Sequence, residues 1–346
     1  MKLNSFVTAL AIALTLVCLN GCSSGTSGSS TASNASSASK GKQITVCLLP
    51  KKKGVPYFTS CAQGAAEAAK ELGNVKLIYD GPTSGDATDA SKLIDQWTAQ
   101  GVDVIAVSPS DPAVLGPEMK RAQAAGVKVI TWDADAAPDT RSFFVNQATP
   151  AEIGDGLVDA MANDLGGKAA SGQVAIITAT LSAANQNDWI AEMKKRLTQY
   201  PGLQLIAIKP SNDDQQTAFS ETQDLMKANP NLKGIFAISS VAFPGAAEAV
   251  KQAGMTGKVF VTGLSTPNDM RSYVNEGVVK SVILWNTVDL GYLTVYAARS
   301  LMDGDLKAGS TSINAGRLGT KKVIGDNVML GGIMTFTKAN IGKYHF

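Results

Sequence analysis

The sequence predicts an α/β protein made of two doubly wound parallel sheets. Short, nearly continuous apolar runs that are rich in β-branched residues alternate with Ala-rich helical segments, and this alternation occurs in two series of the same rhythm. Within each series the apolar runs begin 25 to 32 residues apart. That spacing is typical of a strand, a crossover helix and the next parallel strand.

The apolar runs are the predicted strands. Parallel strands that are covered by helices on both faces are apolar throughout, whereas half-exposed strands alternate. The segment 141–154, between the two series, is predicted to be an extended piece that leads into a helix and crosses between the domains. The predicted strands are 43–49, 75–79, 102–107 and 127–131 in the first series, and 173–179, 203–208, 232–238 and 259–263 in the second.

The composition favours binding over catalysis. The 346 residues suffice for two α/β domains, and 45% of them are hydrophobic. Lys and Arg total 31 against 29 Asp and Glu, so no nucleic-acid partner is predicted. His345 is the only histidine, which argues against a Ser-His-Asp triad or an HExxH zinc site. We therefore predict no catalytic residue, no cofactor and no metal.

The first forty residues are predicted to be a signal peptide and a tether. Lys2 precedes the apolar run 6–19, which is shorter than the ~20 residues of a membrane-spanning helix and is typical of a signal peptide. The run ends in Leu-Asn-Gly-Cys, which resembles the lipobox of bacterial lipoproteins, with Cys22 as the acylated residue. Nine serines between positions 23 and 40 indicate a flexible linker. We predict a signal peptide at 1–21, a lipidated tether at 22–40, and a folded part on the extracytoplasmic face of the cell envelope.

Two further cysteines lie in the predicted folded part. Cys47 is in a strand and Cys61 in a helix, both among small or apolar residues. We expect buried thiols, although the sequence alone leaves a Cys47–Cys61 disulfide open.

The candidate ligand site follows from the strand ends. In doubly wound sheets a ligand binds beyond the carboxyl ends of the strands, and with two domains the cleft between them is the expected site. Aromatic rings pack on the C–H faces of sugars, and carboxylates and amides pair with sugar hydroxyls. Trp97 lies inside a helix and is expected in the core. The predicted ligand-binding residues are Lys51, Tyr57, Phe58, Asp133, Asp135, Asn185, Gln186, Trp189, Ser239, Ser265 and Trp285.

Asp133 and Asp135 allow two other readings. Their D-x-D spacing is found among metal ligands, but no histidine or third oxygen cluster accompanies them. The same two carboxylates could serve a carbohydrate-active enzyme, but no further catalytic machinery is present in the sequence. Both readings are less favoured than ligand binding.

Several segments carry a family resemblance that extends from about position 45 to the end of the chain. The chain resembles the solute receptors of sugar ABC transporters, of the type I periplasmic-binding-protein-like fold, in the group of rhamnose-binding proteins and LsrB-type autoinducer-2 receptors. The segments include PYFTSCAQGAAEAAKELG, TWDADAAPDTRSFFVNQATPAEIG, ANQNDWIAEMKK, GKVFVTGLSTPNDMRSYVNEGVVK, LWNTVDLGY and ANIGKY.

The resemblance implies two lobes joined by three crossovers that close on a ligand and present it to a permease. Lobe 1 would comprise 41–146 and 287–317, and lobe 2 would comprise 147–286 and 318–346. The expected partners are a monosaccharide, an ABC permease and, through the lipid anchor, the membrane. We expect a monomer.

The resemblance points to two different ligands, autoinducer-2 and a deoxyhexose. Autoinducer-2 receptors of this type use a Lys after the first strand, the Asp of a Trp-Asp pair and an Asp-Gln pair, and Lys51, Asp133 and Gln186 match these positions. Asn185 stands where the Asp of that pair would be, and Ile-Ser-Ser at 238–240 replaces a Pro-Asp-Ala stretch. The run from Asn185 to Trp189 is more similar to the rhamnose-binding branch. We therefore favour a deoxyhexose such as rhamnose, with an autoinducer-2 or chemotaxis signal as the alternative.

Overall fold

The computed structural model describes residues 41–346, so the predicted signal peptide, Cys22 and the tether lie outside the described residues. Within the described range, no helix combines the length and the apolar character needed to cross a membrane. The helices are α1 (Pro56–Leu72), α2 (Ala87–Ala99), α3 (Pro112–Ala124), α4 (Pro150–Asp164), α5 (Ala184–Leu197), α6 (Gln215–Ala228), α7 (Ala242–Gln252), α8 (Pro267–Asn275) and α9 (Thr287–Asp303). The strands are β1 (Ile44–Leu49), β2 (Val75–Tyr79), β3 (Val104–Val107), β4 (Lys128–Trp132), β5 (Phe144–Asn146), β6 (Gly172–Thr178), β7 (Leu203–Pro210), β8 (Leu232–Ala237), β9 (Phe260–Gly263), β10 (Ser281–Leu284), β11 (Ser312–Asn314), β12 (Thr320–Ile324), β13 (Asn327–Met329) and β14 (Met334–Thr337).

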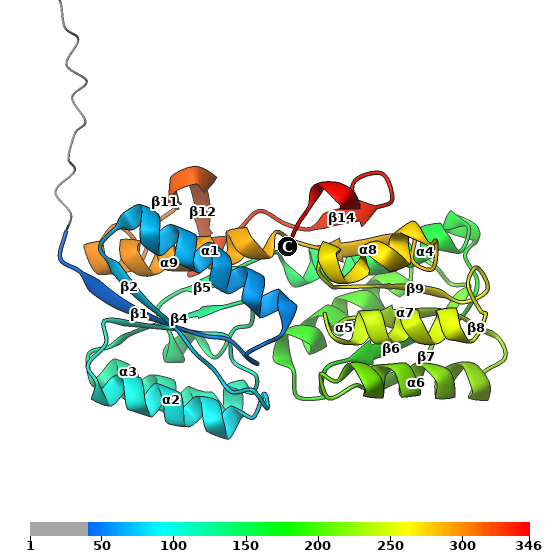
Figure 1. Ribbon diagram of the computed structural model, residues 1–346, viewed down its shortest axis with the longest axis horizontal. Helices are drawn as coiled ribbons and strands as arrows, with labels where there is room; N and C mark the ends of the chain where they lie inside the picture. Colours follow the sequence, from blue (N-terminus) through cyan, green and yellow to red (C-terminus); the bar gives the residue numbers. More distant parts are fainter. Residues whose placement is uncertain (1–40) are drawn as a thin grey trace, which may run out of the picture. The chain divides into compact units, whose positions relative to one another are not determined.

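An eight-stranded sheet forms the centre of what we call lobe 1, with the strand order β11-β12-β13-β5-β4-β3-β1-β2 (Figure 1). Its two faces are covered by different helices. Since side chains along each strand point alternately to opposite faces, neighbouring residues of one strand pack against different helices. Val46 and Leu48 of β1 belong to the core cluster that includes α1 and α9. Cys47 and Leu49 belong to a second cluster with α2 and α3. Burial on both faces explains why β1 is apolar at nearly every position.

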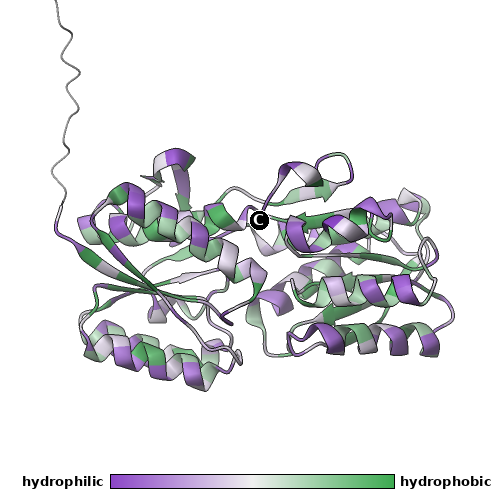
Figure 2. Cartoon of the chain, in the orientation of Figure 1, coloured by the Kyte–Doolittle hydropathy of each residue, from purple (hydrophilic) through white to green (hydrophobic). Residues whose placement is uncertain are grey.

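A four-stranded parallel sheet, with the order β7-β6-β8-β9, forms the centre of lobe 2. The antiparallel pair β10–β14 continues it, since a parallel bridge joins Leu264, just after β9, to Ile283 of β10. Helices α4 to α8 belong to this lobe. The strands are coloured as hydrophobic in Figure 2, and the helices around them are hydrophilic on part of their surface.

The chain passes between the two sheets three times: after β5, after β10 and after β13. This agrees with the type I fold that the sequence predicts. The predicted lobe boundaries remain a proposal, and the pairing of the last strands differs from one of them. The predicted lobe 2 includes residues 318–346, whereas β12 and β13 pair within the sheet of lobe 1 and only β14 pairs in lobe 2. The sheet order therefore favours a last boundary near residue 330.

The eight predicted strands are present as β1 to β4 and β6 to β9, with ends shifted by at most two residues. The predicted crossing segment contains β5, which pairs parallel with β4 and is followed by α4. Trp97 is 3% exposed and lies in the core, as predicted. Cys47 and Cys61 are buried free thiols. Burial raises the pKa of Cys47 to about 12 and that of Cys61 well above its usual value, so both thiols are protonated and unreactive.

Asp164, at the end of α4, carries a buried carboxyl group with few partners to replace the water that it loses on folding. Its side chain is 9% exposed, and its Oδ2 has no hydrogen-bond partner among the described residues. Burial raises the pKa of Asp164 from 3.8 to about 6, although Lys280 acts in the opposite direction. Between these two pH values the folded chain keeps a proton that the unfolded chain releases, so folding stability falls as the pH rises through this window.

We expect Asp164→Asn to raise the melting temperature at about pH 7.5, because the amide carries no charge to desolvate. The gain should shrink as the pH falls toward 3.8, since the wild-type carboxyl is then protonated in the folded state and increasingly also in the unfolded state. Thermal denaturation across this range measures the difference. Asp224→Asn, at an exposed position of α6, is the matched control. An Asp164→Asn protein that melts below the wild type at neutral pH would contradict the expectation.

Candidate ligand-binding site

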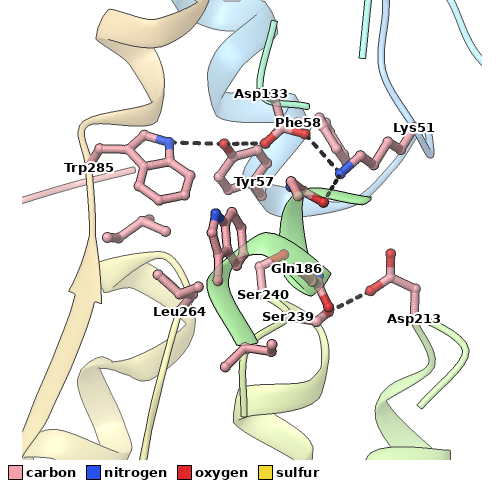
Figure 3. Close-up of a pocket in the computed structure, with 14 residues that line it drawn as sticks. Lys51, Tyr57, Phe58, Asp133, Gln186, Asp213, Ser239, Ser240, Leu264 and Trp285 are labelled. Carbon is pink, nitrogen blue, oxygen red and sulfur yellow. Dashed lines mark hydrogen bonds and ion pairs between the residues drawn. The ribbon is translucent and has the colours of Figure 1, made fainter. Parts of the chain in front are cut away.

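A small pocket lies where loops after the strands of both lobes meet (Figure 3). Its cavity has a volume of about 50 Å³, which is less than the ~300–1,000 Å³ of typical small-molecule sites. Lobe 1 contributes charged and aromatic side chains from α1 and from the loops after β1 and β4. Lobe 2 contributes two indoles, a carboxylate, amides, hydroxyls and aliphatic side chains. The residues that line it are Lys51, Tyr57, Phe58, Asp133, Asn185, Gln186, Trp189, Asp213, Ile238, Ser239, Ser240, Leu264, Leu284 and Trp285.

Asp133 is the polar centre of this pocket. It follows β4 directly and has a φ of 64°, a left-handed conformation that is uncommon for residues other than glycine. Its Oδ1 accepts a hydrogen bond from Tyr57 Oη at 2.7 Å, and its Oδ2 accepts one from Ser108 Oγ at 2.7 Å. The Asp133 side chain is 6% exposed, so its negative charge must be stabilised by these donors and by Lys51 in place of water.

A chain of hydrogen bonds extends from Asp133 in both directions. On one side Trp285 Nε1 donates to Tyr57 Oη at 2.9 Å. Burial and the Asp133 charge raise the pKa of Tyr57 well above its usual value, so its hydroxyl stays protonated and can donate. On the other side Lys51 Nζ lies 3.2 Å from Asp133 Oδ2 and donates to Asn185 Oδ1 at 3.2 Å. The Lys51–Asn185 bond links the end of β1 in lobe 1 to the first turn of α5 in lobe 2.

Gln186 is held by its amide oxygen. That oxygen accepts hydrogen bonds from Thr178 Oγ1 and, at 2.7 Å, from the backbone N–H of Ala179. The orientation leaves the Gln186 NH₂ group available to donate toward the cavity. Across the pocket, Asp213 Oδ1 accepts a hydrogen bond from Ser239 Oγ, which fixes the loop after β7 against the loop after β8 (Figure 3).

Aromatic rings lie beside this hydrogen-bonded chain. Tyr57 and Trp285 meet edge to face with ring centroids 6.0 Å apart, and Trp189 approaches Trp285 at 6.2 Å. Phe58 packs edge to face on Tyr57 at 5.0 Å and on Trp132 at 5.8 Å. Trp132 is fully buried and does not line the pocket, so it supports Phe58 from behind.

Nine of the eleven residues that the sequence predicts for ligand binding line this pocket, and Asp135 and Ser265 do not. Ser265 is fully buried, and its Oγ donates to the carbonyl of Ser240 at 2.8 Å, so it positions a neighbour that does line the pocket. Asp213 also lines the pocket but is not among the eleven predicted residues. Asp214 is the cap of α6, and Asp213 comes before it in the turn after β7. Ile238, Ser240, Leu264 and Leu284 line the pocket too and are not among the eleven, although each lies at the end of a strand or within three residues of it.

Asp135 takes part in a buried ion pair instead. Arg141, whose side chain is 3% exposed, donates to both carboxylate oxygens of Asp135 at 2.9 and 2.6 Å, and it also pairs with Asp326. Because Asp135 and Asp133 have separate partners, they do not form a paired-carboxylate site. Among residues 41–346, no group of three or more His, Cys, Asp or Glu side chains is placed to hold a metal ion.

We expect Asp135→Ala to reduce stability without changing ligand affinity. The substitution removes one of the two carboxylates of buried Arg141, which should cost about 2 kcal/mol of unfolding free energy. Chemical denaturation measures this loss, and calorimetric titration with the wild-type ligand measures the affinity. A variant of unchanged stability that has lost binding would instead indicate that Asp135 is a ligand-binding residue.

Comparisons with known proteins agree with this architecture. Residues 46–306 match the family model described as periplasmic binding protein domain. A solute-binding protein from Clostridium phytofermentas, solved with bound L-rhamnose, is 30% identical, with a TM-score of 0.82 over 88% of this chain and 98% of that one. LsrB from Clostridium saccharobutylicum in complex with AI-2 is 29% identical, with a TM-score of 0.83 over 88% of this chain and all of that one.

A curated relative points the same way. The D-allose-binding periplasmic protein of Escherichia coli (strain K12) is 25% identical over 249 residues, which cover 68% of this chain and 77% of the relative. The matched family consists of binding proteins, which confirms the prediction of a binding protein rather than an enzyme. By its matched domain and its fold, the chain belongs to the periplasmic binding protein family.

Proposed function

We propose that this protein, a sugar-binding periplasmic protein of the ABC-importer type, captures a deoxyhexose of the L-rhamnose class and delivers it to a permease. The observation that carries the proposal is the mixed character of the pocket. Its lining combines aromatic rings with fixed donors and acceptors around Asp133. A sugar ring has the same mixed character, with C–H faces and a rim of hydroxyls.

The polar groups supply the hydrogen bonds that such a ligand needs. Asp133, Lys51 and Gln186 together offer a carboxylate, an ammonium group and a free amide NH₂. Each hydrogen bond to a charged group contributes about 1.5–3 kcal/mol. A few of them exceed the ~8 kcal/mol of a micromolar affinity, and the excess offsets the cost of closing the lobes and immobilising the ligand.

The apolar lining favours a deoxy sugar. Ile238, Leu264 and Leu284 add aliphatic surface beside the indoles. A methyl group fits such surface without leaving a hydroxyl unpaired, whereas a hydroxymethyl group would need a polar partner there. The similar protein that holds L-rhamnose supports the same ligand class.

We propose that binding involves hinge motion. The pocket is lined by both lobes, and its small volume requires the lobes or the aromatic side chains to separate before a sugar ring can enter. The three crossings of the chain between the sheets are the candidate hinge.

A second candidate ligand is autoinducer-2. Lys51, Asp133 and Gln186, which match autoinducer-2 receptors in the sequence, all line the pocket, and the similar LsrB holds that ligand. The neutral Asn185 in place of an acid, and the serines at 239 and 240, make this ligand the less favoured one.

Calorimetric titration separates the two candidates. The full chain is titrated with L-rhamnose, other monosaccharides, among them D-ribose and D-allose, and autoinducer-2. We expect L-rhamnose to bind most tightly. Tighter binding of autoinducer-2 would reverse the assignment, and a chain that binds none of these ligands would contradict the proposed function.

We also propose a lipid-anchored monomer on the extracytoplasmic face. Cys22 lies outside the described residues, and the lipobox-like sequence supports this proposal. Two or more acyl chains anchor a protein stably, because each buried CH₂ contributes about 0.8 kcal/mol. Cys22→Ser should move the protein from the membrane fraction to the soluble fraction, as seen by immunoblotting after fractionation. A Cys22→Ser protein that stays with the membranes would refute the anchor.

A further inference from the structure

A second, larger cavity adjoins the pocket at the cleft, and we call it the outer chamber. Its volume is about 370 Å³, compared with about 50 Å³ for the inner pocket. Loops that follow β1, β2 and β3 of lobe 1 and β6 and β7 of lobe 2 enclose it. The residues that line it are Lys51, Lys52, Ser84, Gly85, Asp86, Ala87, Thr88, Ser110, Asp111, Val114, Ala179, Thr180, Ser182, Ala183, Gln186, Asn212 and Asp213.

The two cavities share a boundary. Lys51, Gln186 and Asp213 line both, so a ligand in the inner pocket lies directly beside the outer chamber. Lys52 Nζ donates to the carbonyl of Asp213 at 3.4 Å, which brings both lobes together at the same boundary. A group attached to the inner ligand would enter the outer chamber past Gln186 once the Lys51–Asn185 and Lys52–Asp213 contacts open.

The chemistry of the outer chamber differs from that of the inner pocket. No aromatic side chain is among its lining residues in the described part of the chain, and hydroxyl, amide and carboxylate groups predominate. Three carboxylates, of Asp86, Asp111 and Asp213, face two ammonium groups, of Lys51 and Lys52. The two signs nearly balance, since Asp86 and Asp111 also cap the N-termini of α2 and α3, and this balance suits a neutral group with many hydroxyls.

Hydroxyl side chains and a helix N-terminus provide hydrogen-bonding capacity in the outer chamber. Ser84, Thr88, Thr180 and Ser182 carry the hydroxyls. Ala183, at the N-cap of α5, has no side-chain acceptor for the first-turn N–H groups, whereas Asp86 and Asp111 cap α2 and α3. Hydroxyl oxygens of a ligand are suitable acceptors for such N–H groups.

We infer that the outer chamber is a subsite for a second, neutral sugar ring, so that the preferred ligand is a disaccharide or glycoside with its deoxyhexose in the inner pocket. This inference rests on the proposed function and deepens it. The aromatic inner pocket holds the deoxyhexose, and the polar outer chamber holds the more hydrophilic ring.

The test compares L-rhamnose with two disaccharides of L-rhamnose and D-glucose by calorimetric titration of the full chain. One disaccharide carries rhamnose at the non-reducing end and the other at the reducing end. We expect at least one of them to bind about tenfold more tightly than L-rhamnose, the effect of one or two added hydrogen bonds.

Filling the outer chamber tests where the second ring binds. Thr88 and Ser182 are exposed residues of its lining that do not line the inner pocket. Thr88→Trp and Ser182→Trp, made separately, should remove the disaccharide advantage and leave the affinity for L-rhamnose within about twofold. Ser220→Trp, at an exposed position of α6 outside both cavities, is the matched control and should keep the advantage.

The outcomes separate the two proposals. If L-rhamnose binds and both disaccharides bind more weakly than it does, the outer chamber is only a solvent path, and the inference is wrong while the proposed function stands. If a disaccharide binds tightly and neither tryptophan variant weakens it, the second ring lies elsewhere and the inference is again wrong. If neither L-rhamnose nor the disaccharides bind, the proposed ligand class fails, and the subsite fails with it.

Discussion

Asp133→Asn should weaken sugar binding by about 30-fold or more, equivalent to about 2 kcal/mol. Asparagine has the same shape and tolerates the left-handed φ of 64°, so the backbone is expected to keep its conformation. The substitution removes the charge that Lys51, Tyr57 and Ser108 converge on. The ligand then loses a charged acceptor, and the Lys51 ammonium group loses its carboxylate partner.

Calorimetric titration with L-rhamnose, or with the ligand that the screen identifies, measures the effect. Asp80→Asn is the matched control, because Asp80 also follows a strand, pairs with a lysine and is 47% exposed outside the pocket. Wild-type affinity in the Asp133→Asn protein would place this carboxylate outside the set of ligand contacts.

Gly291→Ala should lower the unfolding free energy by about 3 kcal/mol or more, because α1 and α9 pack backbone against backbone. A Cβ atom on Gly291 would lie 1.8 Å from the carbonyl oxygen of Cys61, and one on Gly64 would lie 1.7 Å from that of Val288. Neither carbonyl can move without moving its helix. The substitution therefore forces apart the two helices whose first turns lie beside the pocket, with Tyr57 on α1 and Trp285 just before α9.

Chemical denaturation measures this destabilisation. Gly342→Ala is the control, since a Cβ atom there has no heavy atom within 4 Å, and its unfolding free energy should change by less than about 0.5 kcal/mol. Equal denaturation midpoints for Gly291→Ala and the wild type would show that the two helices have room to separate.

Much of the fold could be predicted from the sequence, because strands buried on both faces have a simple apolar signature. The strands near the C-terminus have no such signature. Lys321 and Lys322 interrupt β12, and β13 is three residues long. Their place in the lobe 1 sheet depends on pairing with β5, which is distant in the sequence, so no local pattern reveals it. The boundary at residue 318 that the family resemblance implies places them in lobe 2 instead.

The candidate site was predictable to the extent that it follows from strand ends. Lys51, Asp133 and Trp285 each come directly after a strand or within two residues of one, and all three line the pocket. Asp135 shows the limit of this rule. Its partner Arg141 is also bound by Asp326, 185 residues further along the chain, and no local pattern reveals that ion pair.

The contact between Trp285 and Tyr57 has a practical consequence. Trp285 belongs to the lobe 2 side, and its indole N–H is bonded to a hydroxyl from lobe 1. If the proposed hinge motion breaks that bond, the indole becomes exposed to more polar surroundings, which shifts its fluorescence emission. Trp97 and Trp132 lie in the interior of lobe 1 and supply a constant background. Intrinsic tryptophan fluorescence can therefore follow the proposed opening and closing of the lobes in real time, without an attached dye.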